Sequence, residues 1–136
     1  MKIAITGASG FVGRQLVPLL QESGHELLVL GRSKAKMLEL FPDCASGTYE
    51  ALKDDTVSID LLVHLSVINN DADVALDKYR QVNVELFQKV VTDAQSAGIG
   101  RILNVSSTHA LDPKNQTHYA VTKREALTIA LGAKGI

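Results

Sequence analysis

Residues 6–13 decide the fold of this chain, and they read Thr6-Gly7-Ala8-Ser9-Gly10-Phe11-Val12-Gly13. A short apolar run at residues 3–5 precedes this stretch. Beyond it, apolar residues recur at the three- and four-residue steps that are typical of a helix face. The order predicts a strand, a tight turn and a helix, which is the context that a glycine-rich phosphate-binding motif requires.

The three glycines of this stretch each meet a different steric demand. Gly7 permits a tight turn, Gly10 lets the backbone approach a pyrophosphate, and Gly13 lets the helix pack close to the strand. Main-chain amides around Ser9 and Gly10, together with the dipole of the helix that follows, then hold the anion. A glycine turn without a ligand is the alternative. The residues predicted here to bind a dinucleotide are Gly7, Ser9, Gly10, Phe11, Val12 and Gly13.

Apolar runs and turn residues divide the rest of the chain into alternating strands and helices. Further strands are predicted at residues 27–30, 61–65 and 102–106, with a short one near 45–49. Helices are predicted at residues 34–41 behind Ser33 as the cap, from residue 74 to Gly98, and over 119–131. This alternation predicts an α/β fold with a doubly wound parallel sheet, Rossmann-like, as a single domain over residues 1–136.

The composition excludes several classes of protein. The chain has 14 Lys and Arg against 15 Asp and Glu, and its net charge of −1 argues against nucleic acid or an anionic membrane as a partner. The single cysteine, Cys44, rules out an internal disulfide and a multi-cysteine metal site, and no group of His, Asp and Glu has metal spacing. No apolar run approaches the roughly 20 residues of a membrane span. We therefore expect a soluble, cytoplasmic protein without a metal.

The end of the second predicted strand bears on the choice of coenzyme. An acidic residue there would accept hydrogen bonds from the adenosine ribose and favour NAD. This chain has Gly31-Arg32-Ser33 instead, and a guanidinium pairs well with a 2′-phosphate. Arg32 therefore favours NADP over NAD. The alternative is a solvated arginine that stacks loosely on the adenine.

Polar residues also follow the later strands, at the edge of the sheet where ligands of such folds bind. Ser66 follows the strand that ends at Leu65, and a Ser-Ser-Thr run occupies residues 106–108. Tyr119 and Lys123 are four residues apart, so they share one face of the last helix. A tyrosine and a lysine in this arrangement are either functional or ordinary surface residues.

The histidines have different expected roles. His64 lies within an apolar strand and is predicted to be a packed core histidine rather than a catalyst or a metal ligand. His109 and His118 flank the candidate site, where they could touch a substrate.

Five motifs follow one another along the chain. They are Thr6-Gly-Ala-Ser-Gly-Phe-Val-Gly13, His64-Leu65-Ser66, Asn83, Val105-Ser-Ser-Thr108 and Tyr119-Ala-Val-Thr-Lys123. Together they resemble the short-chain dehydrogenase/reductase superfamily, and more narrowly its extended branch, the NAD-dependent epimerase/dehydratase family of nucleotide-sugar enzymes. The resemblance covers essentially the whole chain, and the Tyr-x-x-x-Lys pair is its most telling part.

The resemblance implies catalytic roles for a tyrosine, a lysine and a serine. Tyr119 would exchange a proton with a substrate hydroxyl or carbonyl, and the charge of Lys123 would favour its phenolate. Both side chains would also contact the coenzyme, Lys123 through the nicotinamide ribose. Ser107 would hydrogen-bond the substrate oxygen, with Ser106 or Thr108 as alternatives. The coenzyme itself, NADP or NAD, would give or take the hydride.

Three further residues receive roles from the same resemblance. Leu65 and Ser66 join the cofactor-binding residues. Asn83 joins the catalytic ones, because it would support a proton-relay water next to the lysine. The alternative for Asn83 is a hydrogen bond to a nearby backbone carbonyl, since a polar side chain near a buried face needs a partner.

Two departures from the family pattern temper this reading. The loop between Ser107 and Tyr119 is shorter than extended members usually have, and the chain lacks the usual C-terminal substrate-binding part. We expect either the N-terminal part of a longer protein or a truncated homologue that binds dinucleotide without efficient turnover. The leading prediction is an NAD(P)-dependent oxidoreductase or nucleotide-sugar epimerase/dehydratase, and the alternative is a non-catalytic dinucleotide-binding regulatory or scaffold module.

The resemblance also implies a partner. Related enzymes pair two helices with their copies in a second subunit, and the matching helices here lie near residues 82–91 and 120–129. We therefore expect a homodimer that binds a small-molecule substrate, with a nucleotide sugar as the candidate.

Overall fold

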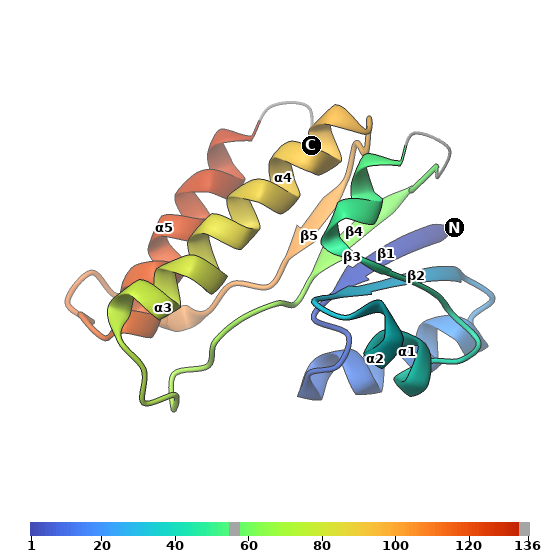
Figure 1. Ribbon diagram of the computed structural model, residues 1–136. Helices are drawn as coiled ribbons and strands as arrows, with labels where there is room; N and C mark the ends of the chain where they lie inside the picture. Colours follow the sequence, from blue (N-terminus) through green and yellow to red (C-terminus); the bar gives the residue numbers. More distant parts are fainter. Residues whose placement is uncertain (55–57, 134–136) are drawn as a thin grey trace.

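The computed structural model describes residues 1–54 and 58–133 and shows one parallel five-stranded sheet in the order β3-β2-β1-β4-β5 (Figure 1). Its strands are β1 (Lys2–Thr6), β2 (Glu26–Gly31), β3 (Ala45–Thr48), β4 (Leu61–His64) and β5 (Ile102–Asn104). The helices between them make this a doubly wound α/β fold, as the alternation of strands and helices predicts.

Eight helical segments connect and cover the strands in the described part of the chain. They are α1 (Phe11–Glu22), α2 (Lys34–Leu40), η1 (Tyr49–Lys53), α3 (Leu76–Arg80), η2 (Gln81–Glu85), α4 (Leu86–Ser96), η3 (Thr108–Leu111) and α5 (His118–Gly132). Helices α1 and α2 cover one face of the sheet, and α4 and α5 lie side by side on the other (Figure 1).

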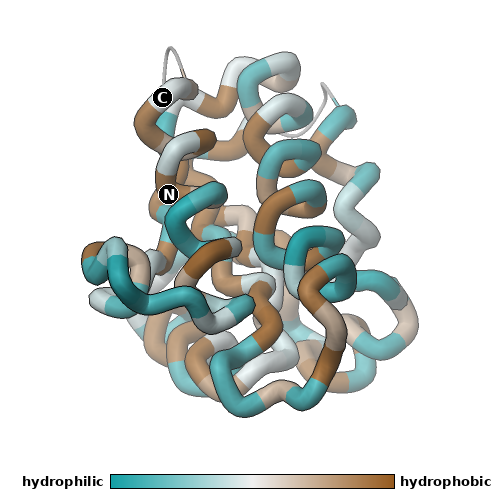
Figure 2. Tube along the Cα trace, turned by 90° about the vertical axis from the view of Figure 1, so that its left-hand side faces the viewer, coloured by the Kyte–Doolittle hydropathy of each residue, from teal (hydrophilic) through white to brown (hydrophobic). Residues whose placement is uncertain are grey.

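Alternate strand residues enter two separate cores, because successive side chains of a strand point to opposite faces. Ile3, Ile5 and Val29 face α1 and α2, where Val17 and Met37 join them. The second core, on the α4 face, contains Ala4, Leu28, Leu30, Leu62, Val90 and Ala94. In Figure 2 brown and teal residues alternate along the helices, as expected where one side of a helix packs on the sheet.

Local chemistry sets several of the element boundaries as expected. The Ser33 hydroxyl accepts a hydrogen bond from the Lys36 amide at 3.3 Å, which caps α2. Gly24 and Gly98, just beyond α1 and α4, have φ values of 78° and 72°, a backbone conformation in which glycine is favoured. Pro18 lies inside α1 without ending it.

The long helix expected from residue 74 is wrong in two respects. It begins at Leu76, and a π-helical turn, η2, interrupts it before α4. Within this turn the Leu86 amide donates to the Gln81 carbonyl, five residues back. The extra residue changes the direction in which Asn83 points, and its amide group bonds to groups outside the helix, as described below.

The last strand is shorter than expected, because β5 ends at Asn104 and the Val105 carbonyl instead accepts a hydrogen bond from the Lys123 ammonium. Within the described residues β5 pairs only with β4, so its other edge is open. The Leu103 and Val105 side chains are exposed there.

Ion pairs fix the short helix η1 against α4. Lys89 on α4 contacts Glu50 at 3.0 Å and Asp93 at 2.6 Å, and Lys53 contacts Asp93 at 3.7 Å. Exposed pairs of this kind contribute little stability singly, and together they join η1 to α4. Among the described helices, none is long and apolar enough to cross a membrane.

Candidate functional site

A cleft of about 950 Å³ lies at the carboxyl ends of β1, β2, β3 and β4. This volume lies at the upper end of the range of small-molecule sites. The residues that line it are Gly7, Ser9, Gly10, Phe11, Val12, Gly13, Leu30, Gly31, Arg32, Ser33, Lys36, Met37, Tyr49, Leu65, Ser66, Val67, Ile68, Asn69, Lys78, Val82 and Leu86. Every cofactor-binding residue expected from the glycine turn and from the ends of β2 and β4 is among them.

The glycine turn is packed so tightly that side chains would collide at two of its positions. Gly7 has a φ of 71°, and a Cβ there would lie 2.6 Å from the backbone of Leu65 and Ser66. A Cβ on Gly13 would lie 2.4 Å from the Ala8 carbonyl oxygen. The turn therefore holds the first strand close to the end of β4 and brings α1 close to the turn, as the spacing of the glycines predicts.

One of the amides expected to hold an anion is engaged within the turn itself. The Gly10 amide is committed to the Gly7 carbonyl at 3.0 Å, so it closes the turn rather than pointing at a ligand. The first helical turn of α1 starts at Phe11, and its N–H groups have no acceptor within the helix. No side chain caps this end of α1. The amides from Phe11 onward are therefore available to an anion at this turn, and the role expected of the Ser9 amide stays a prediction.

The cleft is cationic although the chain as a whole is nearly neutral. Its lining carries Arg32, Lys36 and Lys78, and among the lining residues that the structure describes there is no carboxylate. Lys78 is held by Gln81, whose side-chain oxygen lies 2.8 Å from its Nζ. Such a lining favours a ligand with several negative charges.

The tyrosine, lysine and serine of the family pattern form a second group beside the cleft, not within its lining. Lys123 is buried, and its Nζ donates to the Val105 carbonyl at 2.6 Å. Burial lowers the pKa of this ammonium. The Ser107 hydroxyl accepts a hydrogen bond from the His109 amide at 3.2 Å, and the His109 ring stands edge-on to Tyr119 with centroids 5.8 Å apart. Lys123 thus bonds the backbone just beyond β5, and the His109 residue links Ser107 to Tyr119.

Asn83 is buried in the π-helical turn, where all its bonds go to protein groups. Its Oδ1 accepts from the Ile68 amide at 2.8 Å, and its Nδ2 donates to the Ile68 carbonyl and to the Thr122 hydroxyl, each at 3.2 Å. The Thr122 hydroxyl in turn lies 3.1 Å from the Tyr119 carbonyl. Asn83 therefore links the wall of the cleft to the helix that carries Tyr119 and Lys123. It makes the backbone bond given above as its alternative, and its support of a proton-relay water stays a prediction.

His64 is a core histidine, as predicted. It is 4% exposed, one ring nitrogen lies 2.8 Å from the Thr6 hydroxyl, and its ring stacks at a tilt on Phe87. Burial, and secondarily the charge of Lys123, lower its pKa to about 4, while the backbone of Ser66 acts in the opposite direction.

The shifted pKa of His64 predicts how stability depends on pH. The unfolded histidine binds a proton near pH 6.5 and the folded one only near pH 4. The contribution of His64 to the free energy of unfolding is therefore complete above pH 6.5 and is lost as the pH falls toward 4. Between pH 7 and pH 5 the loss from this residue is about 2 kcal/mol. Urea unfolding of the wild type and of His64→Gln at both pH values measures it, because all other titrating groups are shared. Equal pH slopes in the two proteins would contradict the assignment.

Several lining residues were not predicted to be functional. Lys36 lies in the first turn of α2, four residues after Arg32, and a second cation so close to Arg32 could have identified it. Tyr49 comes from a weakly patterned stretch, and its hydroxyl lies 3.2 Å from the Ser66 hydroxyl. Lys78 and Ile68 reach the cleft from segments that carry no motif, so no sequence signal marks them.

Comparisons with known proteins agree with this geometry. The model of a family described as "NAD dependent epimerase/dehydratase family" matches residues 3–132. The 2-alkyl-3-oxoalkanoate reductase of Stenotrophomonas maltophilia is 28% identical over 116 residues, which cover 79% of this chain and 33% of that protein. This chain thus spans about a third of the length of that relative.

Two solved structures show the same fold. A putative NAD-dependent epimerase/dehydratase from Bacillus halodurans is 27% identical with a TM-score of 0.80, over 98% of this chain and 65% of that one. MoeE5, solved in complex with UDP-glucose and NAD, is 23% identical with a TM-score of 0.79, over 96% of this chain and 48% of that one.

Proposed function

This chain belongs to the NAD dependent epimerase/dehydratase family, and from that membership we propose that it binds a dinucleotide coenzyme in the cleft for hydride-transfer chemistry. The chemistry is that of an oxidoreductase or of a nucleotide-sugar epimerase or dehydratase, carried out in the cytoplasm. MoeE5, with its UDP-glucose and NAD, supports a nucleotide sugar as the substrate class.

The observation that carries the proposal is the fit between the cleft and a diphosphate. Gly7 and Gly13 leave no room for a Cβ and so pack the turn tightly against its neighbours, while Gly10 lines the cleft and puts no side chain between the turn and a pyrophosphate. The uncapped N-terminus of α1 offers amides and the positive end of a helix dipole at the same place. The three cations of the lining match further phosphate charge.

NADP is the preferred coenzyme in this proposal. Arg32 follows β2, where the adenosine ribose of a dinucleotide lies in folds of this kind. Lys36, one turn into α2, lines the cleft together with Arg32 and Ser33. Two cations and a hydroxyl suit a 2′-phosphate, whereas no carboxylate among the described lining residues is present to accept bonds from a free ribose diol.

In this chemistry the protein side chains exchange a proton with the substrate and hold the substrate in place. When bound, the nicotinamide gives or takes a hydride. Tyr119 exchanges a proton with the substrate oxygen, and the ammonium of Lys123 stabilises its phenolate. Ser107 orients the substrate oxygen through its hydroxyl. Lys123, whose Nζ donates to the Val105 carbonyl, would hold the nicotinamide ribose when the coenzyme is bound, and Asn83 keeps the turn of α5 fixed to the cleft wall.

A non-catalytic dinucleotide-binding module is the second candidate, and one observation favours it. Ser107, Tyr119 and Lys123 do not line the cleft in the described structure, and the Lys123 and Ser107 side chains are engaged with backbone groups. In this proposal most contacts to the coenzyme come from the cleft lining, so binding alone does not separate the candidates.

Tyr119→Phe does separate them. We expect the variant to keep the wild-type dissociation constant for NADPH within about twofold, because it keeps the ring and most contacts to the coenzyme come from the cleft lining. Turnover should fall by about 10²- to 10⁴-fold, because the general acid/base is gone. The assay follows NADPH oxidation with carbonyl substrates and NAD(P)-dependent conversion of UDP-glucose. Binding without turnover in both the wild type and the variant would support the regulatory module instead.

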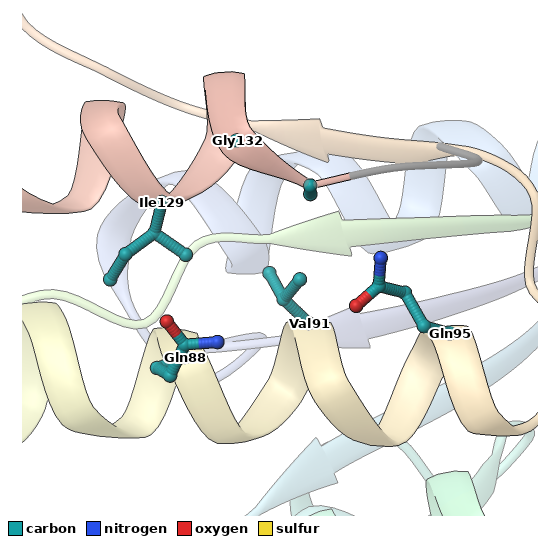
Figure 3. A pocket seen from close by; sticks show the side chains of 6 residues that line it. Gln88, Val91, Gln95, Ile129 and Gly132 are labelled. Carbon is teal, nitrogen blue, oxygen red and sulfur yellow. The ribbon is translucent and has the colours of Figure 1, made fainter.

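We also propose that two copies of the chain pair through α4 and α5. Gln88, Val91 and Gln95 of α4 and Ile129 and Gly132 of α5 face one another across a shallow groove of about 440 Å³ (Figure 3). A groove lined by apolar and uncharged side chains suits helices of a second copy. Sedimentation at micromolar concentration should give the mass of two chains, and the mass of one chain would contradict the pairing.

A further inference from the structure

A tyrosine side chain bridges the ends of two distant strands of the sheet. Tyr49 is the first residue of η1, directly after β3, and its hydroxyl lies 3.2 Å from Oγ of Ser66. Ser66 follows β4, and the sheet places β2 and β1 between β3 and β4. The phenol therefore reaches along the carboxyl edge of the sheet, and both Tyr49 and its partner Ser66 line the cleft.

The register of the strands sets what lies on either side of this phenol. Gly31 of β2 pairs with Thr48 of β3, so Arg32 and Tyr49 are the next residues on neighbouring strands. At the other end, the Ser66 amide lies where a Cβ on Gly7 would come within 2.6 Å of it. Tyr49 thus lies between the Arg32 side of the cleft and the glycine turn.

A dinucleotide has groups in the same order. The adenosine ribose of NADP carries its phosphate on C2′, the purine on the adjacent C1′ and the diphosphate on C5′. With the diphosphate at the glycine turn and the 2′-phosphate at Arg32, as proposed above, the purine falls beside Tyr49. We propose that Tyr49 is the residue that recognises the purine base, its ring serving as a stacking face that Ser66 holds in place. This inference rests on the proposed binding of a dinucleotide.

The environment of the ring suits that role. It is half-buried and packs against the core that contains Leu28, Leu30 and Leu52, so its inner side is supported. The ion pair between Glu50 and Lys89 fixes the helix that begins at Tyr49. A ring held at its hydroxyl and at its backbone loses little freedom when a base stacks on it. Stacking of this kind accepts any flat base, so Tyr49 would distinguish ligands that carry a base from ligands that carry none.

The test compares three variants with two probes. Tyr49→Leu removes the ring and keeps an apolar side chain, Tyr49→Phe keeps the ring without the hydroxyl, and Ser66→Ala removes the partner of the hydroxyl. Adenosine 2′,5′-bisphosphate carries the purine, and nicotinamide mononucleotide lacks it. Dissociation constants come from calorimetry, and thermal unfolding checks that each variant folds.

We expect Tyr49→Leu to weaken binding of adenosine 2′,5′-bisphosphate by about 5- to 100-fold, the range that base stacking contributes. Its binding of nicotinamide mononucleotide should stay within about twofold of the wild type. Tyr49→Phe and Ser66→Ala should each weaken the purine probe by no more than about fivefold, because each loses one neutral hydrogen bond.

Fluorescence provides a readout that a merely structural tyrosine would not change. The chain has three tyrosines and no tryptophan, so emission reports on phenols alone. Adenosine 2′,5′-bisphosphate should quench the wild type and leave the emission of Tyr49→Phe unchanged at saturation, although that variant still binds.

Three outcomes would overturn the inference. In the first, Tyr49→Leu binds the purine probe as tightly as the wild type. In the second, it loses affinity equally for both probes, which would make Tyr49 a structural residue. In the third, the wild type binds neither NADPH nor adenosine 2′,5′-bisphosphate, and then the proposed function falls together with the inference. The first two results, obtained with a wild type that binds NADPH, leave the proposed function standing.

Discussion

Replacing Gly7 by alanine should abolish most NADPH binding and destabilise the chain by roughly 2–5 kcal/mol. Two effects add here. The φ of 71° is unfavourable for any residue with a Cβ, and that Cβ would lie 2.6 Å from the backbone of Leu65 and Ser66. Because backbone on both sides must shift, the turn leaves its place beside the end of β4. The amides at the start of α1 then no longer face a bound phosphate, and the loss of one or two charge-assisted hydrogen bonds weakens NADPH binding by about 100-fold.

Gly24→Ala is the matched control for this prediction. Gly24 has nearly the same backbone conformation, with a φ of 78°, but a Cβ there meets nothing within 4 Å. It should therefore show only the conformational cost, about 1–2 kcal/mol, with NADPH affinity unchanged. Urea unfolding and calorimetric titration of both variants separate the steric effect from the conformational one. If the two variants lose equal stability, the tight packing of the turn does not hold in solution.

Arg32→Asp should reverse the preference between the two coenzymes. The variant loses a charge-assisted contact with the 2′-phosphate, so its affinity for NADPH should fall by about 10- to 100-fold. The new carboxylate can accept hydrogen bonds from the free ribose diol of NADH, so affinity for that coenzyme should rise. The measurement is the ratio of the two dissociation constants in the wild type and in the variant.

Lys34→Asp controls for the change in charge. Lys34 is exposed and is the first residue of α2, two residues after Arg32. It is not part of the cleft lining, whereas Arg32 and Lys36 are. This variant should keep the wild-type ratio of the two dissociation constants. A ratio that does not respond to Arg32→Asp would show that Arg32 does not contact the 2′-phosphate.

Features of the fold that depend on neighbouring residues could be predicted from the sequence. The strand, glycine turn and helix at residues 3–20 follow from a short apolar run, glycine sterics and helical spacing. The Ser33 cap and the positive φ at Gly24 are equally local. His64 could be placed in the core because a histidine in a continuous apolar strand has no route to solvent.

Features that depend on distant partners could not. The π-helical turn forms where Asn83 bonds Ile68 and Thr122, two residues that no local pattern connects to it. Tyr49 lies in a stretch without periodicity, and only the pairing of β3 with β2 brings it beside Arg32. The roles of Ser107, Tyr119 and Lys123 stay predictions, because they rest on the order of motifs and not on the cleft.

The π-helical turn at Gln81–Glu85 joins α3 and α4 into one continuous helix and holds one residue more than an α-helical turn. The wider turn absorbs this residue, so the two halves keep their places. Tyr79, before the turn, donates to the loop carbonyls of Asn69 and Ala72, and Phe87, after it, stacks on His64. Deleting one residue there would restore α-helical hydrogen bonding, but it would also remove the bulge that directs the Asn83 side chain to its partners. We therefore expect this short turn to tolerate substitutions of its exposed residues better than changes in length.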